Sequence, residues 1–460
     1  MTPRAATDSP VIAELHAALP GRVITDPSGL VALSTDKSGH RGEGVPLAAV
    51  HAQSVEDVQQ VCRIASAHRT PVVTRGAGTG LSGGATAGAG EIVLSLERMD
   101  QVLEISEGNR LAVVQAGVIN GRLDEHLAPH GLWWSPDPAS KDISTVGGNI
   151  AMNAGGLLCA KYGVTRESVL ALKVVLADGR LLEVGHRTVK GVTGYDLTAL
   201  MIGSEGTLGI IVEATLALRP AVTGDTPTLG AVFPSIVDAA AAAAEVVRAG
   251  HVPAAMELLD RPCLDAIAAH TGKELAPGGQ AYLLLQHDGA AAREEVASTA
   301  EILARHRAQL THATDQADSE RLFALRRLMF PSLQALGSLL IEDVAVPRDR
   351  LAEAFAEIRR IEEEFGLSIP TAAHAGDGNL HPTFTFTGEI VPPQIWEAAG
   401  RIFEMALAMG GTLTGEHGVG LLKRRWLADE LGADQMDLQQ QIKAVFDPAE
   451  ILNPGKIFTP

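Results

Sequence analysis

Two histidines flank a tight-turn signal in the stretch IPTAAHAGDGNLHPTFTF. Asp-Gly between two strand-like runs is the strongest short signal for a β-hairpin. If Asp377 and Gly378 form a two-residue turn, His374 lies directly opposite His381. Directly opposed residues share one face of a hairpin with Cβ atoms about 4.5–5.5 Å apart, which suits two ligands of one metal ion.

A carboxylate beside a third histidine, in the loop GGTLTGEHGVG, is able to complete such a site. Glu416 precedes His417, and adjacent residues of extended chain point to opposite faces, so one can bind metal while the other faces a substrate. Two imidazoles and one carboxylate leave open coordination positions, as a catalytic ion requires. A polar hairpin with surface histidines is the ordinary alternative, but the paired histidines together with EHGVG favour a divalent metal. We predict zinc, with manganese and iron as alternatives.

A glycine-rich loop, RGAGTGLSGGATAGAG, follows a helix-like segment at 54–69 and the strand-like PVVT. Successive N–H groups of such a loop can cradle a pyrophosphate, to which Arg75 would add charge. Gly78, Gly80 and Gly83 satisfy GxGxxG, but a Rossmann fold requires a helix next, and EIVLSLE is strand-like. This context argues against an NAD-binding site of the Rossmann type. Taken alone, the loop is also compatible with an ordinary turn or linker.

The elements that must position these residues fall into two groups. Up to about residue 218 the chain is glycine-dense and strand-rich, with the segments PVVT, EIVLSL, LAVVQAG, VLALKVVLADG and TLGIIVEATLAL. The segment 219–228, RPAVTGDTPT, has two prolines and a glycine and indicates a domain boundary. After it, predicted helices alternate with strand-like runs such as YLLLQHD and indicate a smaller α+β cap. These helices cover 235–249, 289–309, 319–336 and 348–366.

Composition limits the class of protein. At 460 residues the chain exceeds what one core usually serves, so we expect two domains. A formal net charge of -18 disfavours nucleic acid and anionic lipid surfaces as partners. Three dispersed cysteines indicate neither a disulfide framework nor an iron–sulfur cluster, which fits a reducing cytoplasm. We expect no signal peptide and no membrane span, with peripheral attachment to the inner membrane through a partner as an alternative.

Two further segments, SPDPASKDISTVGGNIAMNAGGLLCAKYGVT and GYDLTALMIGSEGTLGIIVEATL, follow the glycine-rich loop in order. With that loop they resemble the FAD-binding domain (PCMH-type) of the vanillyl-alcohol-oxidase superfamily. Over about residues 40–457 the chain is similar to the FAD-linked 2-hydroxy-acid dehydrogenases, the branch of glycolate oxidase catalytic subunits and D-lactate and D-2-hydroxyglutarate dehydrogenases. The resemblance implies an α+β fold: an FAD-binding domain at 1–220, with its core at about 40–218, and a cap with an antiparallel sheet at 221–460, whose C-terminal tail returns to the FAD domain.

The same resemblance implies which residues bind FAD. The pyrophosphate would lie on the loop from Arg75 to Ser82, and the remaining positions would line the adenosine and isoalloxazine path. The implied residues are Arg75, Gly76, Gly78, Thr79, Gly80, Leu81, Ser82, Pro136, Asp137, Thr145, Gly148, Asn149, Ala154, Gly155, Glu205, Gly206, Ile211 and Asn453. Some relatives tether their flavin through a histidine where this chain has Thr79, so we expect non-covalent FAD. Cys159 is the residue able to overturn this, although a buried inert thiol is its simpler interpretation.

In the second domain, the resemblance implies that His374, His381 and Glu416 bind the metal and that His417 is the base. Arg326, in ERLFALRRLMFP, matches a carboxylate-binding arginine. The neighbouring Arg327 and a solvated helix face are the alternatives.

Two more positions bear on the substrate. Asn379 is a candidate to hydrogen-bond it. Ile341 stands where the D-2-hydroxyglutarate enzymes place a lysine, which favours a monoacid such as D-lactate or glycolate.

These inferences predict metal-assisted oxidation of a small D-2-hydroxy acid, with the proton taken by His417 and a hydride passed to flavin N5. Electrons would leave through a separate acceptor: a quinone-linked carrier, a flavoprotein or an iron–sulfur subunit. Oxygen is a further candidate acceptor, and a homodimer is one option for assembly. The alternatives are a non-redox transferase like alkylglycerone-phosphate synthase, a peptidoglycan enzyme like UDP-N-acetylenolpyruvoylglucosamine reductase, and a non-catalytic flavin-binding or scaffold subunit. None of these explains both the paired histidines and EHGVG.

Overall fold

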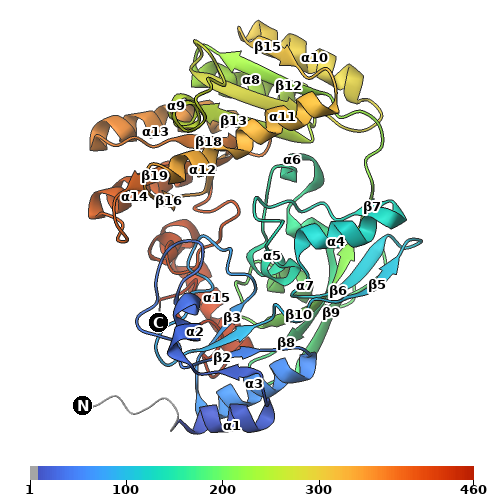
Figure 1. Cartoon of the computed structure of the whole chain (residues 1–460), viewed down its shortest axis with the longest axis vertical. Helices are drawn as coiled ribbons and strands as arrows, with labels where there is room; N and C mark the ends of the chain where they lie inside the picture. The colour runs from blue at the N-terminus through green and yellow to red at the C-terminus, as the bar shows by residue number, and fades with distance from the viewer. Residues whose placement is uncertain (1–8, 460) are drawn as a thin grey trace. The chain divides into compact units, whose positions relative to one another are not determined.

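The computed structural model describes residues 9–459 (Figure 1). The expectation of no signal peptide rests partly on residues 1–8, which lie outside the described residues. The chain forms two compact units. Unit 1 is formed by three segments: the chain up to Ala154, the stretch Val164–Ala221, and the chain from Glu416 onward. Unit 2 consists of Gly155–Gly163 and Val222–Gly415. No helix within 9–459 is long and apolar enough to cross a membrane.

Unit 1 contains two main sheets. In the first, of order β1-β2-β4-β3, strands β2, β4 and β3 are parallel and β1 is antiparallel to β2. The second, of order β5-β6-β10-β8-β9, is antiparallel throughout. The strands of the first sheet are β1 (Val23–Ile24), β2 (Ala48–His51), β3 (Val72–Arg75) and β4 (Ile92–Ser95). Those of the second are β5 (Val102–Ser106), β6 (Leu111–Gln115), β8 (Val169–Val175), β9 (Leu181–Gly185) and β10 (Ile210–Ala217), with a separate pair β7 (Leu132–Trp133) and β11 (Arg219–Pro220).

The helices of unit 1 are mostly short. They are α1 (Pro10–Ala18), α2 (Pro27–Leu30), α3 (Val55–His68), α4 (Asn120–Leu127), α5 (Val146–Met152), α7 (Leu197–Met201) and α15 (Leu427–Phe446), with 3₁₀ turns η2 (Val31–Ser34), η3 (Ala128–His130), η4 (Thr165–Ser168) and η6 (Arg424–Trp426). Helix α3 confirms the predicted helix at 54–69, and its start is fixed by a reciprocal capping box between Ser54 and Asp57. The apolar residues of α1 and α3 pack in one core with those of β2 and β4.

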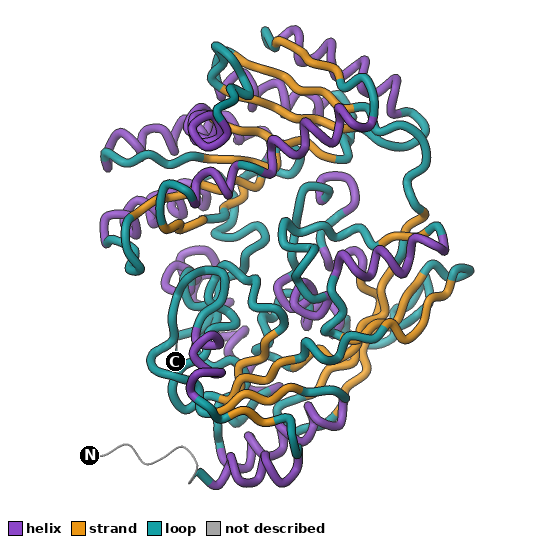
Figure 2. Tube along the Cα trace, viewed as in Figure 1, coloured by secondary structure: helices purple, strands orange, loops and turns teal. Residues whose placement is uncertain are grey.

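Unit 2 is an antiparallel sheet with helices on both faces (Figure 2). Its strand order is β15-β12-β14-β13-β18-β19-β16, and β17 also pairs with β19. The strands are β12 (Thr228–Phe233), β13 (Ala255–Asp260), β14 (Ala281–Gln286), β15 (Gln309–His312), β16 (Ser338–Ile341), β17 (Val344–Ala345), β18 (Thr371–His374) and β19 (Asn379–Phe386). The helices are α6 (Cys159–Tyr162), α8 (Ile236–Arg248), α9 (Arg261–Thr271), α10 (Ala292–Arg305), α11 (Gln316–Arg327), α12 (Met329–Gln334), α13 (Leu351–Phe365) and α14 (Pro393–Ala408), with the 3₁₀ turn η5 (Arg348–Arg350).

The helix predicted at 319–336 is two helices, α11 and α12, which meet at Leu328. Pro331 explains the break, because it has no N–H with which to continue the hydrogen bonds of α11 and is tolerated only in the first turn of a new helix. Residues of α9, α11 and α12 form one core with residues of β13, β14 and β18, so these helices cover the same face of the sheet.

Candidate functional site

The two hairpin histidines lie on β18 and β19, but the register differs from the prediction. His374 pairs with Asn379, and His381 pairs with Ala372. The connection therefore has four residues, 375–378, and the predicted two-residue turn with directly opposed histidines is wrong.

The longer turn has a local cause. The His374 carbonyl accepts hydrogen bonds from the N–H groups of Asp377 (3.2 Å) and Gly378 (3.0 Å), and the Asp377 carboxylate accepts one from the Asn379 N–H (3.1 Å). Gly378 has φ +93°, and a Cβ there would lie 2.2 Å from the Val346 carbonyl oxygen, so only glycine fits. Because side chains alternate with period two, pairing displaced by two residues still leaves both histidines on one face.

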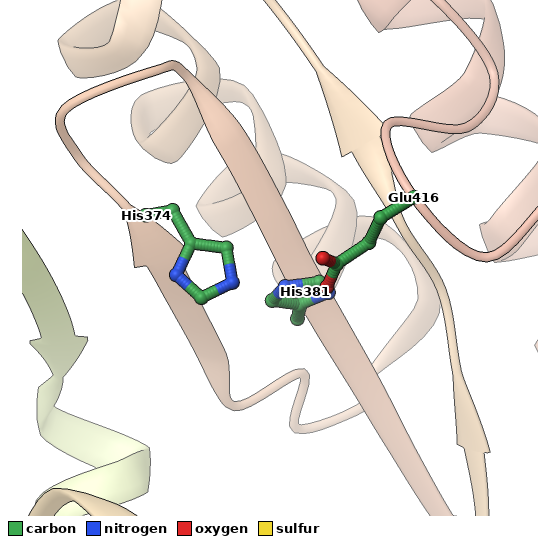
Figure 3. A group of neighbouring side chains, drawn as sticks. All are labelled: His374, His381 and Glu416. Carbon is green, nitrogen blue, oxygen red and sulfur yellow. The ribbon is translucent and has the colours of Figure 1, made fainter. Parts of the chain in front are cut away.

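Two imidazoles and a carboxylate converge at this hairpin (Figure 3). One ligand atom from each of His374, His381 and Glu416 lies within 4.8 Å of the others. The two rings meet edge to face, with centroids 5.0 Å apart. Glu416 comes from the loop at which the chain passes from unit 2 to unit 1. Two nitrogen donors and one oxygen donor with further positions open form a donor set that fits a catalytic divalent ion.

A buried acid, Glu257, contacts His374 from the neighbouring strand β13. Strand β13 pairs with β18 so that Glu257 is directly opposite His374. Its Oε1 is 2.7 Å from His374 Nδ1, and its Oε2 accepts a hydrogen bond from Arg326 Nε (3.0 Å) and forms an ion pair with Arg326 Nη2 (2.9 Å). Complete burial raises the pKa of Glu257, but the charges of His374 and Arg326 outweigh that effect and hold its pKa below the ordinary value.

The loop before Glu416 is anchored within unit 2 by a second buried acid, Asp343. Its carboxylate accepts hydrogen bonds from the Thr414 hydroxyl (2.6 Å) and the Gly415 N–H (3.0 Å). Gly415 also packs against the Asn379 side chain, since a Cβ there would lie 2.7 Å from that amide carbon. These contacts fix the course of the chain just before Glu416.

The loop after Glu416 is anchored within unit 1. The Ser82 hydroxyl, in the glycine-rich loop, donates to the His417 carbonyl (3.1 Å). The Glu205 carboxylate accepts from the N–H groups of Val419 (2.7 Å) and Gly420 (2.8 Å). Burial raises the pKa of Glu205 to about 7, although the two N–H donors oppose the increase. His417 Nε2 itself is 3.9 Å from Glu416 Oε1.

The residues predicted to bind substrate have distinct environments. Arg326 is buried and engaged by Glu257, whereas its alternative, Arg327, is exposed. The Oδ1 atom of Asn379 is buried without a hydrogen-bond partner, which is uncommon for a buried polar atom. Ile341 pairs with Thr383, two residues beyond His381, and therefore lies on the same face of the sheet as His374 and His381.

The glycine-rich loop forms a narrow backbone cradle. Strand β4 follows it without an intervening helix, as predicted. A Cβ at Gly76 would lie 2.3 Å from Thr145 Oγ1, and Gly78 has φ +68°, so both positions require glycine. Arg75 donates from Nη1 to the carbonyls of Thr35 and Ala85 (2.9 and 3.1 Å), which stiffens the loop. Thr79 and Leu81 lie in the same loop and are partly exposed.

The other predicted flavin positions belong to unit 1, with one exception, Gly155, which belongs to unit 2. Thr145 caps α5 through the Gly148 N–H, and the Nδ2 of Asn149 is buried without a partner, an orphaned polar group that suits a bound cofactor. Asn453 accepts from the Thr74 N–H and donates to the Glu205 carbonyl. Five further positions have these environments: Pro136 and Gly206 are buried, Asp137 and Ala154 are partly exposed, and Ile211 belongs to the hydrophobic core of unit 1. The residues present fit FAD.

Sequence reasoning missed Glu257, Asp343 and Asp36. The Asp36 carboxylate accepts from the N–H groups of Ser38 (3.1 Å) and Ala85 (3.3 Å) and so ties a preceding loop to the glycine-rich loop. A signal existed for the first two, because each is an acidic residue within an otherwise apolar strand-like run, AMELLD and SLLIEDVAV. Such residues are rarely buried unless they are paired.

Comparison with known proteins identifies the family. Residues 46–185 match the FAD binding domain, and residues 224–457 match the C-terminal domain of FAD linked oxidases. The chain is 40% identical over 423 residues to the glycolate oxidase subunit GlcD of Bacillus subtilis, covering 90% of each chain. It is 38% identical over 403 residues to a D-lactate dehydrogenase of Archaeoglobus fulgidus, covering 87% of this chain and 89% of the relative.

Among solved structures, 4-ethylphenol oxidase from Gulosibacter chungangensis matches with a TM-score of 0.77 and 20% identity, covering 98% of this chain and 97% of that one. This likeness concerns the fold and, with the matched domains, confirms the predicted FAD-binding domain of vanillyl-alcohol-oxidase type followed by an α+β cap. The chain therefore belongs to the FAD-linked oxidases, the family that its motifs indicated.

Proposed function

We propose that this enzyme oxidises a small D-2-hydroxy acid to the 2-oxo acid, with D-lactate or glycolate favoured over D-2-hydroxyglutarate. Glycolate oxidase subunits and D-lactate dehydrogenases among its relatives support the substrate class. The observation that carries the chemistry is the convergence of His374, His381 and Glu416, whose ligand atoms lie within 4.8 Å of one another. We propose these three as ligands of a divalent metal, zinc in the first instance, and FAD as a non-covalently bound cofactor.

The overall reaction removes a hydride from Cα and a proton from the hydroxyl of the acid. When bound, FAD supplies the acceptor for the hydride, and a divalent cation supplies positive charge beside the substrate's oxygens. We assign His417 as the base that takes the hydroxyl proton at its imidazole Nε2. The Glu416 carboxylate, 3.9 Å from that atom, would stabilise the imidazolium that results.

The substrate's carboxylate needs a cation, for which we propose Arg326. Glu257 uses the Nε and Nη2 groups of this arginine, so Nη1 is the group we assign to the substrate. Asn379, with its buried and unpartnered Oδ1, is our candidate to accept a hydrogen bond from the substrate.

Selectivity for a monoacid is proposed to depend on Ile341. Its apolar side chain lies on the face of the sheet that carries the metal donors and cannot pair with a second carboxylate. Burying an unpaired carboxylate beside an apolar group is costly, so a diacid should bind less well.

For reoxidation we propose a separate electron acceptor, such as a quinone-linked carrier, a flavoprotein or an iron–sulfur subunit. The name of one relative, a glycolate oxidase subunit, supports a multi-subunit arrangement. The alternatives, a non-redox transferase or a scaffold, would have no use for the three metal donors, which supports the oxidase.

The test is anaerobic bleaching of the flavin by glycolate, both lactates and D-2-hydroxyglutarate. Rapid bleaching by D-lactate or glycolate is expected, and bleaching by none of these acids would refute the proposed activity. His417→Ala should slow bleaching by about 10²–10⁴-fold with its FAD content unchanged. Unchanged bleaching in this variant would remove the base assignment alone.

A further inference from the structure

Glu257 contacts both a proposed metal ligand and the proposed substrate cation. It is fully buried on β13, the strand next to β18, and is directly opposite His374. One carboxylate oxygen is 2.7 Å from His374 Nδ1, and the other accepts a hydrogen bond from Arg326 Nε and forms an ion pair with Arg326 Nη2. Arg326 reaches this face of the sheet from α11, whose Phe323 packs in the core on the same face.

The contacts determine which atoms of His374 are donors and acceptors. The Arg326 guanidinium, which only donates, keeps Glu257 ionised, and an ionised carboxylate only accepts. His374 must therefore donate its Nδ1–H to Glu257, which leaves Nε2 with the lone pair that a metal ion requires. A hydrogen bond of this kind fixes both the tautomer and the ring orientation of a metal-binding histidine.

We propose that Glu257 is a positioning residue that couples the metal site to the substrate's carboxylate. Its contact with His374 Nδ1 directs Nε2 of that ring to the ion. Its contacts with Nε and Nη2 of Arg326 leave Nη1 to bind the substrate's carboxylate. This inference rests on the proposed function, because it takes His374 as a metal ligand and Arg326 as the cation for the acid. One buried side chain thus sets the distance between two parts of the site that lie far apart in the sequence.

Glu257→Gln tests the coupling because it keeps the shape and changes one acceptor into a donor. Arg326 offers only donors, so the amide oxygen must face it and the amide NH₂ must face His374. The NH₂ group then requires His374 Nδ1 to accept, which moves the proton to Nε2, the atom meant for the ion. Zinc affinity is expected to fall by about 10–100-fold. The KM for the acid should rise because a neutral amide holds the guanidinium less firmly than a carboxylate, so that Nη1 is no longer fixed in position for the substrate.

Asp260→Asn is the matched control. Asp260 lies on the same strand and accepts two hydrogen bonds, from the Cys263 and Thr371 N–H groups, and within residues 9–459 it forms no hydrogen bond with His374 or Arg326. Zinc affinity would be measured on the FAD-loaded proteins by competition with a chromogenic chelator, together with FAD content and the thermal midpoint. Asp260→Asn should lower the midpoint and leave zinc affinity unchanged, whereas Glu257→Gln should weaken zinc binding.

The outcomes separate the two proposals. If the wild type binds neither Zn²⁺ nor Mn²⁺, the metal site of the proposed function fails. If the wild type binds zinc and Glu257→Gln binds it equally well, the proposed function stands and the positioning role is refuted. If Glu257→Gln does not fold, a crystal structure of the zinc-loaded wild type decides: zinc on Nε2 of His374 supports the role, and zinc on Nδ1 overturns it.

Discussion

The carboxylate of Glu205 should make the stability of unit 1 depend on pH, and Glu205→Gln should remove that dependence. Glu205 is buried, and its carboxylate accepts hydrogen bonds from the N–H groups of Val419 and Gly420. These two residues follow the proposed base His417 in the chain. Burial raises its pKa to about 7 from an ordinary value of 4.5. A group whose pKa is raised by folding contributes most to stability while it is protonated, and it loses that contribution as pH rises through the folded pKa.

The magnitude follows from these two values. At about 1.4 kcal/mol for each pH unit between 4.5 and 7, ionisation of Glu205 costs about 3.5 kcal/mol above pH 7. Most of that cost falls between pH 5 and pH 8. Glutamine does not ionise, so the free energy of unfolding of the wild type should decline by about 2.5 kcal/mol relative to the variant over this range.

Urea unfolding of wild type and Glu205→Gln at several pH values between 5 and 8 gives the two stability curves. The difference between them isolates Glu205, because Asp260, whose burial also raises its pKa to about 7, is present in both proteins. Amide exchange at Val419 and Gly420 would localise the effect to the loop after His417. Two curves that remain parallel from pH 5 to pH 8 would refute the reasoning.

Three further predictions concern the loop before Glu416, the position of Ile341, and the proposed metal ion. Asp343→Ala removes the acceptor of both the Thr414 hydroxyl and the Gly415 N–H, so about 1–3 kcal/mol is lost at the loop and zinc affinity should fall about tenfold or more; unchanged affinity in a chelator competition would contradict this. Ile341→Lys should raise kcat/KM for D-2-hydroxyglutarate relative to D-lactate, and an unaltered ratio would exclude this position from selectivity. Exhaustive chelation should abolish flavin bleaching by the acid and leave FAD bound, with recovery on adding zinc or manganese; full activity in metal-free protein would mean that His374, His381 and Glu416 have only a structural role.

The elements that bear the site were largely predictable because their signals are local. Strand-like runs such as PVVT and EIVLSL are β3 and β4, and the absence of a helix after the glycine-rich loop was visible in the sequence. What the sequence could not predict is which side chains meet across distant strands. That Glu257 lies opposite His374 depends on the pairing of β13 with β18, which are separated by more than 100 residues. The same holds for Gly155–Gly163, a short segment that leaves unit 1 and packs in unit 2.

Arg326 shows how a prediction from the sequence can leave out a residue's partner within the protein. The sequence suggested that the charge of Arg326 pairs with a substrate's carboxylate. It could not show that a carboxylate of the protein itself, Glu257, also pairs with this arginine. The structure has it buried with two nitrogens on Glu257, whereas Arg327 is exposed. A buried arginine without a partner would be prohibitively unstable, so an internal carboxylate had to exist, and only the strand pairing of unit 2 identifies which one.

The hairpin shows why a wrong register still led to the right neighbours. The predicted pairing placed His374 against His381, and the observed pairing places it against Asn379, two residues away. A displacement of one residue would have turned one histidine to the opposite face, but a displacement of two preserves the face. The two imidazoles become diagonal neighbours with ring centroids 5.0 Å apart, still within reach of one ion. Directly opposite His374 the longer turn presents Asn379, whose unpartnered Oδ1 therefore lies on the same face as both histidines. The extra residues of the turn thus add a polar group to this face without removing either imidazole.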